Sequence, residues 1–174
     1  MKGPFSKVGE IMTGDEFESA VKRNSQRIYL IALSFTKNTC DSEDIMHNVF
    51  LKLWRQAKPF EDNAHIDKWL TCVCVNESKN YIKSLFRNHT DIDDCVLVSP
   101  DSFETQAQQD LFNAVMNLPK KYRTVIHLFY YEDMSIRDIT KILKIKENAV
   151  KTRLSRAREK LKEELGDDWI NEQD

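Results

Sequence analysis

The stretch SIRDITKILKIKENAVKTRLSRAREKL, residues 135–161, decides the fold of this chain. Ser135, with Asp138 three residues later, has the S-x-x-D form of a capping box and so predicts the start of a helix. Apolar residues then recur at helical spacing, which gives this helix one buried face. That face consists of Ile136, Ile139 and Leu143.

A second helix begins after the short segment Lys144-Ile145-Lys146. Two helices at this separation predict a helix-turn-helix, whose second helix enters the DNA major groove with its N-terminal end first. Lys144 stands where such a turn usually has glycine, so we expect a positive φ there. Lys146 replaces the serine or threonine that would cap the second helix. The apolar face of that helix comprises Val150, Leu154, Ala157, Leu161 and Leu165.

The opposite face of the second helix is polar and basic. Residues 144–162 carry eight basic residues against two acidic residues, a net charge of +6. Lysine and arginine hydrogen-bond guanine edges, and further cations neutralise phosphates, so this face favours DNA binding. The alternative is a solvated basic face on a terminal helix, which a capped and correctly spaced partner helix disfavours. The candidate DNA-binding residues are Asn148, Lys151, Thr152, Arg153, Ser155, Arg156 and Arg158.

Two shorter helices precede this motif, one around Leu111, Val115 and Leu118 and one after Pro119 that ends near Glu132. We therefore expect a second helical domain over residues 107–174. Residues 88–118 contain six acidic residues and no lysine or arginine, a net charge of −6. Together with a Ser-Pro step, this composition predicts an acidic linker over residues 88–106.

The N-terminal part also shows helical periodicity. We expect one helix over residues 15–36, a second capped by Asp41-Ser42 and ended by Pro59, and a third over residues 66–86. Val49 and Leu53 lie on the buried face of the second helix, and residues 60–65 form a polar loop. Residues 1–87 therefore read as a first helical domain. The expected fold class is all-α, with two small helical domains joined by the linker.

Composition excludes several classes of protein. Hydrophobic residues make up 41% of the 174 residues, which excludes a fully disordered chain, and only four glycines and four prolines are present, which disfavours an all-β fold. No apolar run reaches the roughly 18 residues of a membrane span. The N-terminus lacks the apolar core of a secretion signal, so we expect a cytoplasmic protein without membrane insertion.

We expect no metal, no cofactor and no catalytic residue. The pair Cys72 and Cys74 lacks a second nearby Cys or His pair, which makes it a poor zinc signature. In a reducing cytosol the four cysteines, which include Cys40 and Cys95, are expected to fill space as small apolar residues, and oxidation sensing or metal binding is the alternative. No nucleotide-binding loop, HExxH string or GxSxG string is present.

Three strings resemble extracytoplasmic-function (ECF) sigma factors of the bacterial sigma-70 family. The string LPKKYRTVIHLFYYEDMSIRDITKILKIKENAVKTRLSRAREKL is similar to the domain that reads the minus-35 element. CDSEDIMHNVFLKLWRQ and IDKWLTCVCVNESKNYIKSLFR look like the domain that binds polymerase and reads the minus-10 element. The resemblance covers most of residues 10–165. It implies binding to core RNA polymerase and promoter DNA, control by a cognate anti-sigma factor, and no enzymatic activity.

The resemblance also implies roles for N-terminal residues. One helix face would contact the clamp helices of the largest polymerase subunits, although His47-Asn48 stands where the family often has Gln-Glu. A second group would read the minus-10 element, with two amides four residues apart for bases and a cation stripe for phosphates. The polymerase-binding residues are Asp44, Asn48, Leu51 and Trp54. The minus-10 residues are Phe60, Asp62, Asn63, Asn76, Lys79, Asn80, Lys83 and Arg87, of which the first three lie in a loop that would receive a flipped base.

Some alternatives remain open from the sequence. The acidic linker either threads toward the RNA exit path of polymerase or serves as a solubilising spacer. A helix-turn-helix regulator would bind an operator without polymerase and would have no use for the helix over residues 41–56. A small nuclease would need clustered carboxylates for a metal, whereas the acidic residues lie mainly in the linker and at helix starts.

Overall fold

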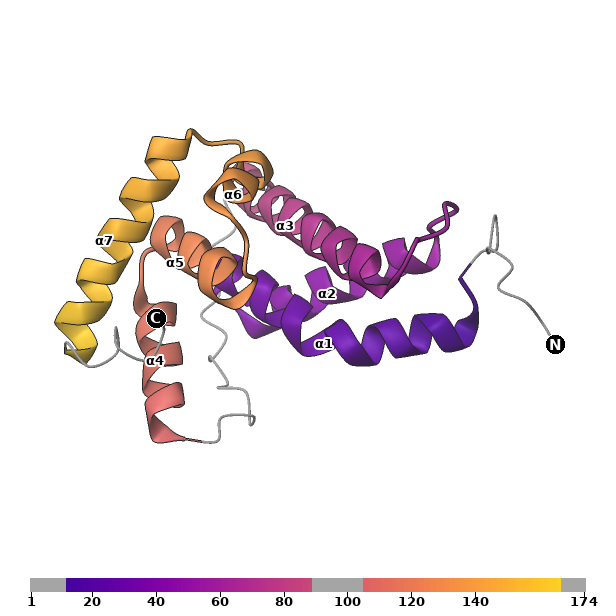
Figure 1. Cartoon of the computed structure of the whole chain (residues 1–174), viewed down its shortest axis with the longest axis horizontal. Helices are drawn as coiled ribbons and strands as arrows, with labels where there is room; N and C mark the ends of the chain where they lie inside the picture. Colours follow the sequence, from indigo (N-terminus) through magenta and orange to yellow (C-terminus); the bar gives the residue numbers. More distant parts are fainter. Residues whose placement is uncertain (1–11, 89–104, 167–174) are drawn as a thin grey trace.

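The computed structural model describes residues 12–88 and 105–166, and within these ranges the chain is helical without strands. The all-α prediction is therefore confirmed. The N-terminal half contains α1 (Gly14–Thr36), α2 (Thr39–Trp54) and α3 (Asn63–Asn88). The C-terminal half contains α4 (Gln106–Asn117), α5 (Lys120–Ile126), the π-helix η1 (His127–Tyr131), α6 (Ile136–Leu143) and α7 (Glu147–Leu165), as Figure 1 shows.

The start of α2 differs from the prediction. Asn38 is the N-cap, and its side chain accepts a hydrogen bond from the backbone N–H of Asp41 at 2.9 Å. Asp41 and Ser42 therefore lie inside the first turn, and the prediction that they cap the helix is wrong. Ser42 is buried, where its hydroxyl donates to the Asn38 carbonyl. The amide oxygen of asparagine caps a helix as well as the carboxylate of aspartate does, so Asn38 and Asp41 are both suitable capping residues by type.

The segment between α2 and α3 lies earlier in the chain than expected. α2 ends at Trp54, before Pro59, and α3 already begins at Asn63. The predicted loop over residues 60–65 is thus wrong for its last three residues, which are helical. Asp62 precedes them and accepts a hydrogen bond from the His65 backbone N–H at 2.7 Å, so its carboxylate satisfies one of the first free donors of α3.

The helix-turn-helix forms as predicted. The Ser135 side chain accepts from the Asp138 backbone N–H at 3.1 Å, and its hydroxyl donates to the Asp138 carboxylate at 2.7 Å. Lys144 has φ 57° and ψ 47°, which confirms the expected left-handed turn residue. Lys146 precedes α7 without a side-chain cap, as its residue type predicted.

The domain boundaries predicted at residues 87 and 107 stay predictions. α4 begins at Gln106, five residues before Leu111, because Thr105 caps it through a 3.2 Å bond from the Gln108 backbone N–H. Most of the predicted acidic linker, residues 89–104, lies outside the described residues. Cys95 falls in that segment as well.

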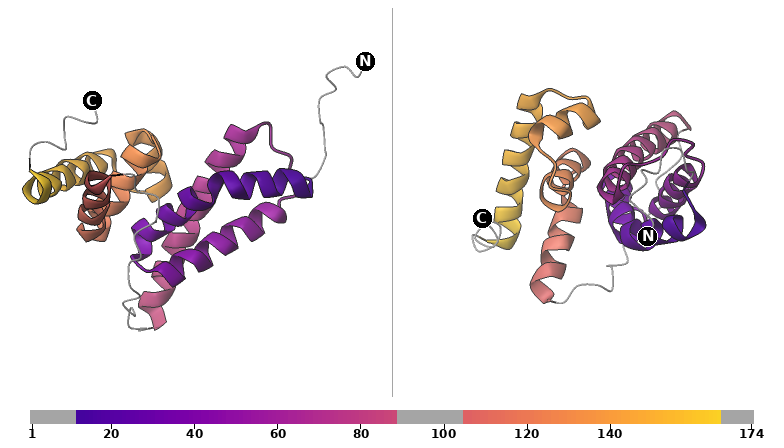
Figure 2. Two further views of the ribbon diagram at one scale, coloured as in Figure 1. Left: turned by 90° about the horizontal axis from the view of Figure 1, so that it is seen from below. Right: turned by 45° about the vertical axis from the view of Figure 1, so that its right-hand side comes forward.

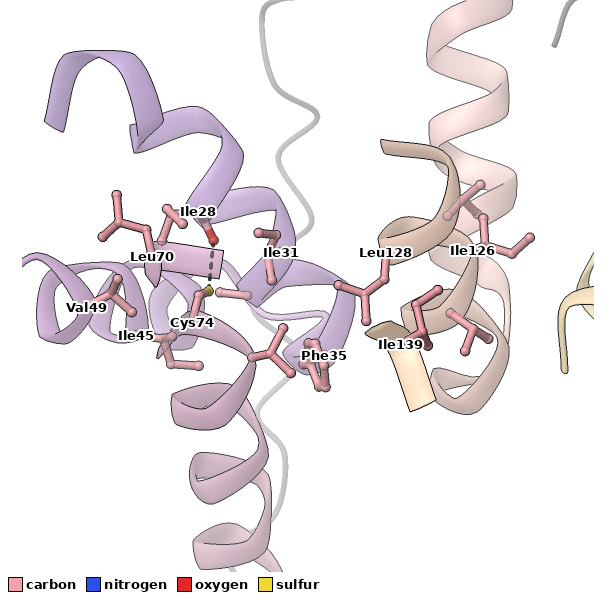
Figure 3. Packing of buried hydrophobic residues seen from close by; sticks show 14 of the residues in the cluster. Ile28, Ile31, Phe35, Ile45, Val49, Leu70, Cys74, Ile126, Leu128 and Ile139 are labelled. Carbon is pink, nitrogen blue, oxygen red and sulfur yellow. Dashed lines mark hydrogen bonds between the residues drawn. The ribbon is translucent and has the colours of Figure 1, made fainter. Parts of the chain in front are cut away.

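The two halves pack against each other, with α1 beside α5 and α3 beside α6 (Figure 2). Leu128 of η1 extends from the C-terminal half toward Ile31 and Phe35 of α1, and all three are buried (Figure 3). The buried cluster of Leu33 with Phe112 and Met116 also joins the halves. Neither apolar spacing nor composition predicts this shared core.

The described cysteines differ in their environments. Cys74 is buried, and its Sγ donates a hydrogen bond to the Ile28 carbonyl at 3.4 Å. Burial raises the pKa of this thiol to about 12, so it is an inert packing residue. Cys40 and Cys72 are exposed. The expectation of a space-filling role is therefore met by Cys74 and wrong for these two.

His127 in η1 should make stability depend on pH. It is fully buried, and its Nε2 has no hydrogen-bond partner among the described residues. Burial, together with the nearby Arg27 charge, lowers the pKa of His127 to about 4. In the unfolded chain the His127 imidazole gains its proton near pH 6.5. The contribution of His127 to the free energy of unfolding is therefore fully present above pH 6.5, and about 3 kcal/mol of it is lost as the pH falls toward 4.

The measurement is urea unfolding at several values between pH 7 and pH 4. Compared with the natural chain, His127→Phe should show a shallower loss of the free energy of unfolding over this window. Glu132 titrates in the same environment, so only the difference between the two chains reports on His127. Parallel curves for the two chains would contradict this assignment.

Candidate nucleic-acid and polymerase interfaces

The face of α7 opposite its apolar residues is exposed. Val150, Leu154 and Ala157 are buried against α5 and α6, which fixes the orientation of the helix. The side chains that this orientation leaves in solvent are those of Asn148, Lys151, Thr152, Ser155 and Arg156. They follow the helix from its N-terminal end, where a major-groove helix meets the bases. We refer to these five residues as the α7 surface.

Two of the arginines predicted to bind DNA are less accessible to DNA than the five residues of the α7 surface. Arg153 and Arg158 are only partly exposed. The Arg158 Nε donates to the Tyr130 hydroxyl at 2.7 Å, and its guanidinium carbon lies 5.8 Å from the Phe129 ring centre. Arg158 therefore ties α7 to η1 and positions the recognition helix.

Lys151 forms an ion pair at the start of α7. Its Nζ lies 2.7 Å from the Glu147 carboxylate, one helical turn away, and this lysine lowers the pKa of Glu147. Both side chains are more than half exposed, so the pair contributes little to stability. A nearby phosphate can therefore compete for Lys151 at small cost. Arg156 has no such acidic residue one turn before it, where Thr152 stands.

One face of α2 combines polar and apolar side chains in solvent. Leu51 and Trp54 are 49% and 53% exposed. Asn48 and Asp44, one turn and two turns before Leu51, are exposed as well. Among the described residues, only Tyr131 is a further exposed large hydrophobic side chain. Val49 and Leu53 are buried, as predicted, and hold the helix against α1. Exposed leucine and tryptophan side by side are typical of a protein-binding surface.

The predicted minus-10 residues of α3 line one side of that helix. Asn76, Asn80 and Lys83 are exposed, whereas Lys79 is partly buried. The Lys79 ammonium donates to the carbonyl of Ile142 in α6 at 2.9 Å. The side chain of Arg87 lies outside the described residues. We refer to Asn76, Lys79, Asn80 and Lys83 as the minus-10 surface.

A hollow lies beside the segment that was expected to receive a flipped base. Its volume is about 590 Å³, and Phe60, Asp62 and Asn63 line it together with the start of α1. The Phe60 ring contacts the Trp69 ring edge to face, with centres 5.5 Å apart, which fixes one wall. Asp62 also caps α3, so its carboxylate is held in place at the rim.

Three charged residues that the sequence did not single out connect the two halves. The Arg27 Nε lies 2.6 Å from the Glu132 carboxylate, and its Nη2 donates to the Thr71 hydroxyl at 2.8 Å. The Arg123 Nε donates to the Ser34 carbonyl at 2.7 Å. The sequence offered no signal that set them apart, since Arg123 follows Lys120 and Lys121, and Glu132 stands beside Asp133 after the end of a helix.

The fold and these surfaces define a class of protein: a two-part helical DNA-binding protein with a separate protein-binding face. Sequence comparison agrees with this class. The model of sigma-70 region 2 matches residues 20–96, and the model of sigma-70 region 4 matches residues 108–161. The chain therefore belongs to the sigma-70 family, and within it to the ECF sigma factors.

Individual relatives have low identity but match along nearly their whole length. The ECF RNA polymerase sigma factor SigW of Bacillus subtilis is 26% identical over 92% of this chain and 96% of its own. The ECF sigma-E factor of Haemophilus influenzae is 23% identical over 91% and 93%. The Bartonella quintana sigma factor RpoE, solved in complex with the anti-sigma factor NepR, shares the fold with a TM-score of 0.68 and 23% identity. That match covers 88% of this chain and 99% of RpoE.

Proposed function

We propose that this ECF sigma factor works through three surfaces with separate tasks. As a sigma factor, the protein binds core RNA polymerase and directs initiation at promoters through minus-10 and minus-35 recognition. In our proposal the α2 face binds polymerase, the minus-10 surface with the hollow beside Phe60 holds the melted element, and the α7 surface reads the minus-35 element. Duplex opening then draws on binding energy, because captured bases offset the few kcal/mol of unstacking.

The exposed pair Leu51 and Trp54 is the observation that carries the proposal. A regulator that binds an operator alone has no need of an apolar patch on α2, whereas a polymerase subunit does. The patch lies on the N-terminal half, and the α7 surface lies at the far end of the C-terminal half (Figure 1). This separation supports contacts with a large partner and with DNA in the same complex.

Three further points complete the proposal. Sigma factors in general are not enzymes, and we propose the same for this chain, with synthesis left to polymerase. We propose that it acts in the cytoplasm, where polymerase meets the chromosome; no helix among the described residues has the length and apolarity of a membrane span. An anti-sigma factor is a further proposed partner, supported by the complex of Bartonella RpoE with NepR.

Transcription from a promoter library tests the proposal. The purified chain is mixed with core polymerase and DNA in which the minus-35 and minus-10 elements are randomised, and transcripts are sequenced. We expect transcripts only when both components are present, with sequence preference at both elements. Operator binding without any stimulation of polymerase would support a regulator and reject the proposal.

Arg156→Ala should selectively remove preference at the minus-35 element. A side chain that hydrogen-bonds a base is worth about 1–3 kcal/mol of discrimination, or roughly 5- to 150-fold, while a phosphate contact weakens all sequences equally. Lys160→Ala is the matched control, since it removes one exposed cation from the same helix outside the α7 surface. If the two variants lose affinity for all sequences alike, Arg156 is a phosphate contact.

A further inference from the structure

One acidic residue lies at the N-terminal end of the recognition helix. Glu147 is the first residue of α7, which follows the turn after α6 (Figure 1), and its side chain is 56% exposed. Residues 144–162 include eight basic and two acidic residues, and Glu147 is the acidic residue that stands where a major-groove helix meets the bases. The phosphates of a bound duplex repel a carboxylate at this position, so it needs a compensating partner on the DNA.

The start of α7 gives this carboxylate one role inside the chain. No side chain caps the helix at Lys146, and a negative charge in the first turn is favourable at the positive end of a helix. That role depends only on the position of Glu147 along the helix. The ion pair with Lys151 adds a second feature, because it holds a donor and an acceptor side by side in solvent, with the Lys151 Nζ 2.7 Å from the Glu147 carboxylate.

This pair has the spacing of the hydrogen-bonding groups on one base pair. In the major groove a G·C pair presents the guanine O6 and N7 acceptors next to the cytosine N4 amine, and O6 and N4 are themselves joined by a hydrogen bond. Their separation is therefore close to the ordinary donor–acceptor distance of about 2.9 Å. The 2.7 Å between the Lys151 ammonium and the Glu147 carboxylate matches it. Lysine donates to guanine and a carboxylate accepts from cytosine N4, so the two side chains can contact both bases at once.

Other base pairs fit this arrangement less well. An A·T pair also has a donor beside an acceptor, but thymine offers one acceptor and a methyl group, whereas guanine offers two acceptors. A C·G pair in the reverse orientation exchanges donor and acceptor, which puts the cytosine amine beside the Lys151 ammonium. Lys151 lowers the pKa of Glu147 and keeps its carboxylate ionised, so Glu147 can only accept hydrogen bonds. The pair should therefore select guanine on one strand.

We propose that Glu147 and Lys151 together read a single G·C base pair of the minus-35 element, with Lys151 on guanine and Glu147 on cytosine. Glu147 is thereby a specificity-determining residue that lies outside the α7 surface. The ion pair is weak in the free chain, but on DNA it stays together, because a Lys151 that moved to a phosphate would leave the Glu147 carboxylate unpaired beside the negative backbone. This inference rests on the proposed minus-35 role of α7.

The test uses the full chain bound to core polymerase. Transcripts are sequenced from promoters in which the minus-35 element is randomised and the minus-10 element is fixed at the sequence that the natural chain prefers. Glu147→Ala removes the acceptor, and Lys151→Ala removes the donor. Glu163→Ala is the matched control, because it removes an equal charge from an exposed position near the C-terminal end of the same helix.

We expect the natural chain to prefer G·C at one position of the minus-35 element, and both Glu147→Ala and Lys151→Ala to weaken that preference. Glu147→Ala should lower the preference for G·C over the other base pairs at least about fivefold at this position, as the loss of a base contact predicts. The double variant should lose little more than either single variant, because residues that act as a pair are not additive. Glu163→Ala should keep the natural preference at every position.

Several results would overturn the inference. An equal gain of transcription on all sequences in Glu147→Ala would mean that the carboxylate only repels phosphates, and weaker preference at every position would mean that it acts on the start of α7. Loss of the G·C preference in Lys151→Ala alone would mean that Lys151 reads its base without Glu147. Effects of the two variants at different positions would mean that the residues contact separate base pairs. In each case the natural chain still prefers a minus-35 sequence, whereas a natural chain without any such preference would count against the proposed function itself.

Discussion

Arg123→Met should lower the free energy of unfolding by about 3–5 kcal/mol, because a charged donor is lost from three carbonyl oxygens. The guanidinium donates to Ser34 at 2.7 Å, to Leu118 at 2.8 Å and to Met116 at 3.1 Å. Burial lowers the pKa of Arg123 to about 10, so the group is still charged at neutral pH. Methionine keeps much of the apolar stem and removes every donor.

The size of this effect follows from the position of the three carbonyls. Ser34 lies in the last turn of α1, and Met116 and Leu118 lie at the end of α4, where carbonyls have no partner within the helix. Neither helix has a basic residue in its last turn. A single buried cation thus satisfies the negative ends of two helices from different halves of the chain.

Urea unfolding followed by circular dichroism measures the effect. Lys121→Ala is the control, because Lys121 is an exposed cation of the same helix that lies 4.9 Å above the Tyr122 ring centre. We expect less than about 1 kcal/mol for that variant. If Arg123→Met lowers the free energy of unfolding no more than Lys121→Ala does, then the three carbonyl oxygens have other hydrogen-bond donors.

Local features of the fold were predictable from the sequence. The left-handed Lys144, the Ser135 cap and the missing cap at Lys146 each depend on a few neighbouring residues. The buried faces of α2 and α7 follow from apolar spacing alone. The start of α2 was missed because three suitable capping residues, Asn38, Asp41 and Ser42, lie close together, and sequence does not rank them.

The packing of the halves was not predictable in the same way. Arg27 and Glu132 are separated by the helices α2 to η1 and by the acidic segment, and periodicity says nothing about which distant side chains meet. Arg158 looked like a DNA contact because it is basic and follows the recognition face, yet Tyr130 and Phe129 hold it. In each case a residue type typical of nucleic-acid binding also satisfies an internal partner, and only three-dimensional contacts separate the two roles.

The double variant Leu51→Ala with Trp54→Ala should weaken binding to core polymerase by roughly 2–4 kcal/mol, or roughly 30- to 700-fold in Kd. Buried leucine and tryptophan anchors contribute affinity through the apolar area that they remove from water on binding. In the free chain about half of each side chain is already in solvent. Truncation therefore removes more from the complex than from the fold, although Trp54 also contacts the Phe17 ring with centres 5.1 Å apart.

Tyr131→Ala provides the matched control, since it removes another large exposed side chain, but from η1 in the other half. Affinity is measured by fluorescence anisotropy of the labelled chain titrated with core polymerase, and thermal unfolding checks that each variant is folded. We expect the control to bind within about threefold of the natural chain, a difference of less than 1 kcal/mol. If the double variant binds equally well, the α2 patch is not the polymerase contact, and the sigma-factor assignment of this face has to move to another surface.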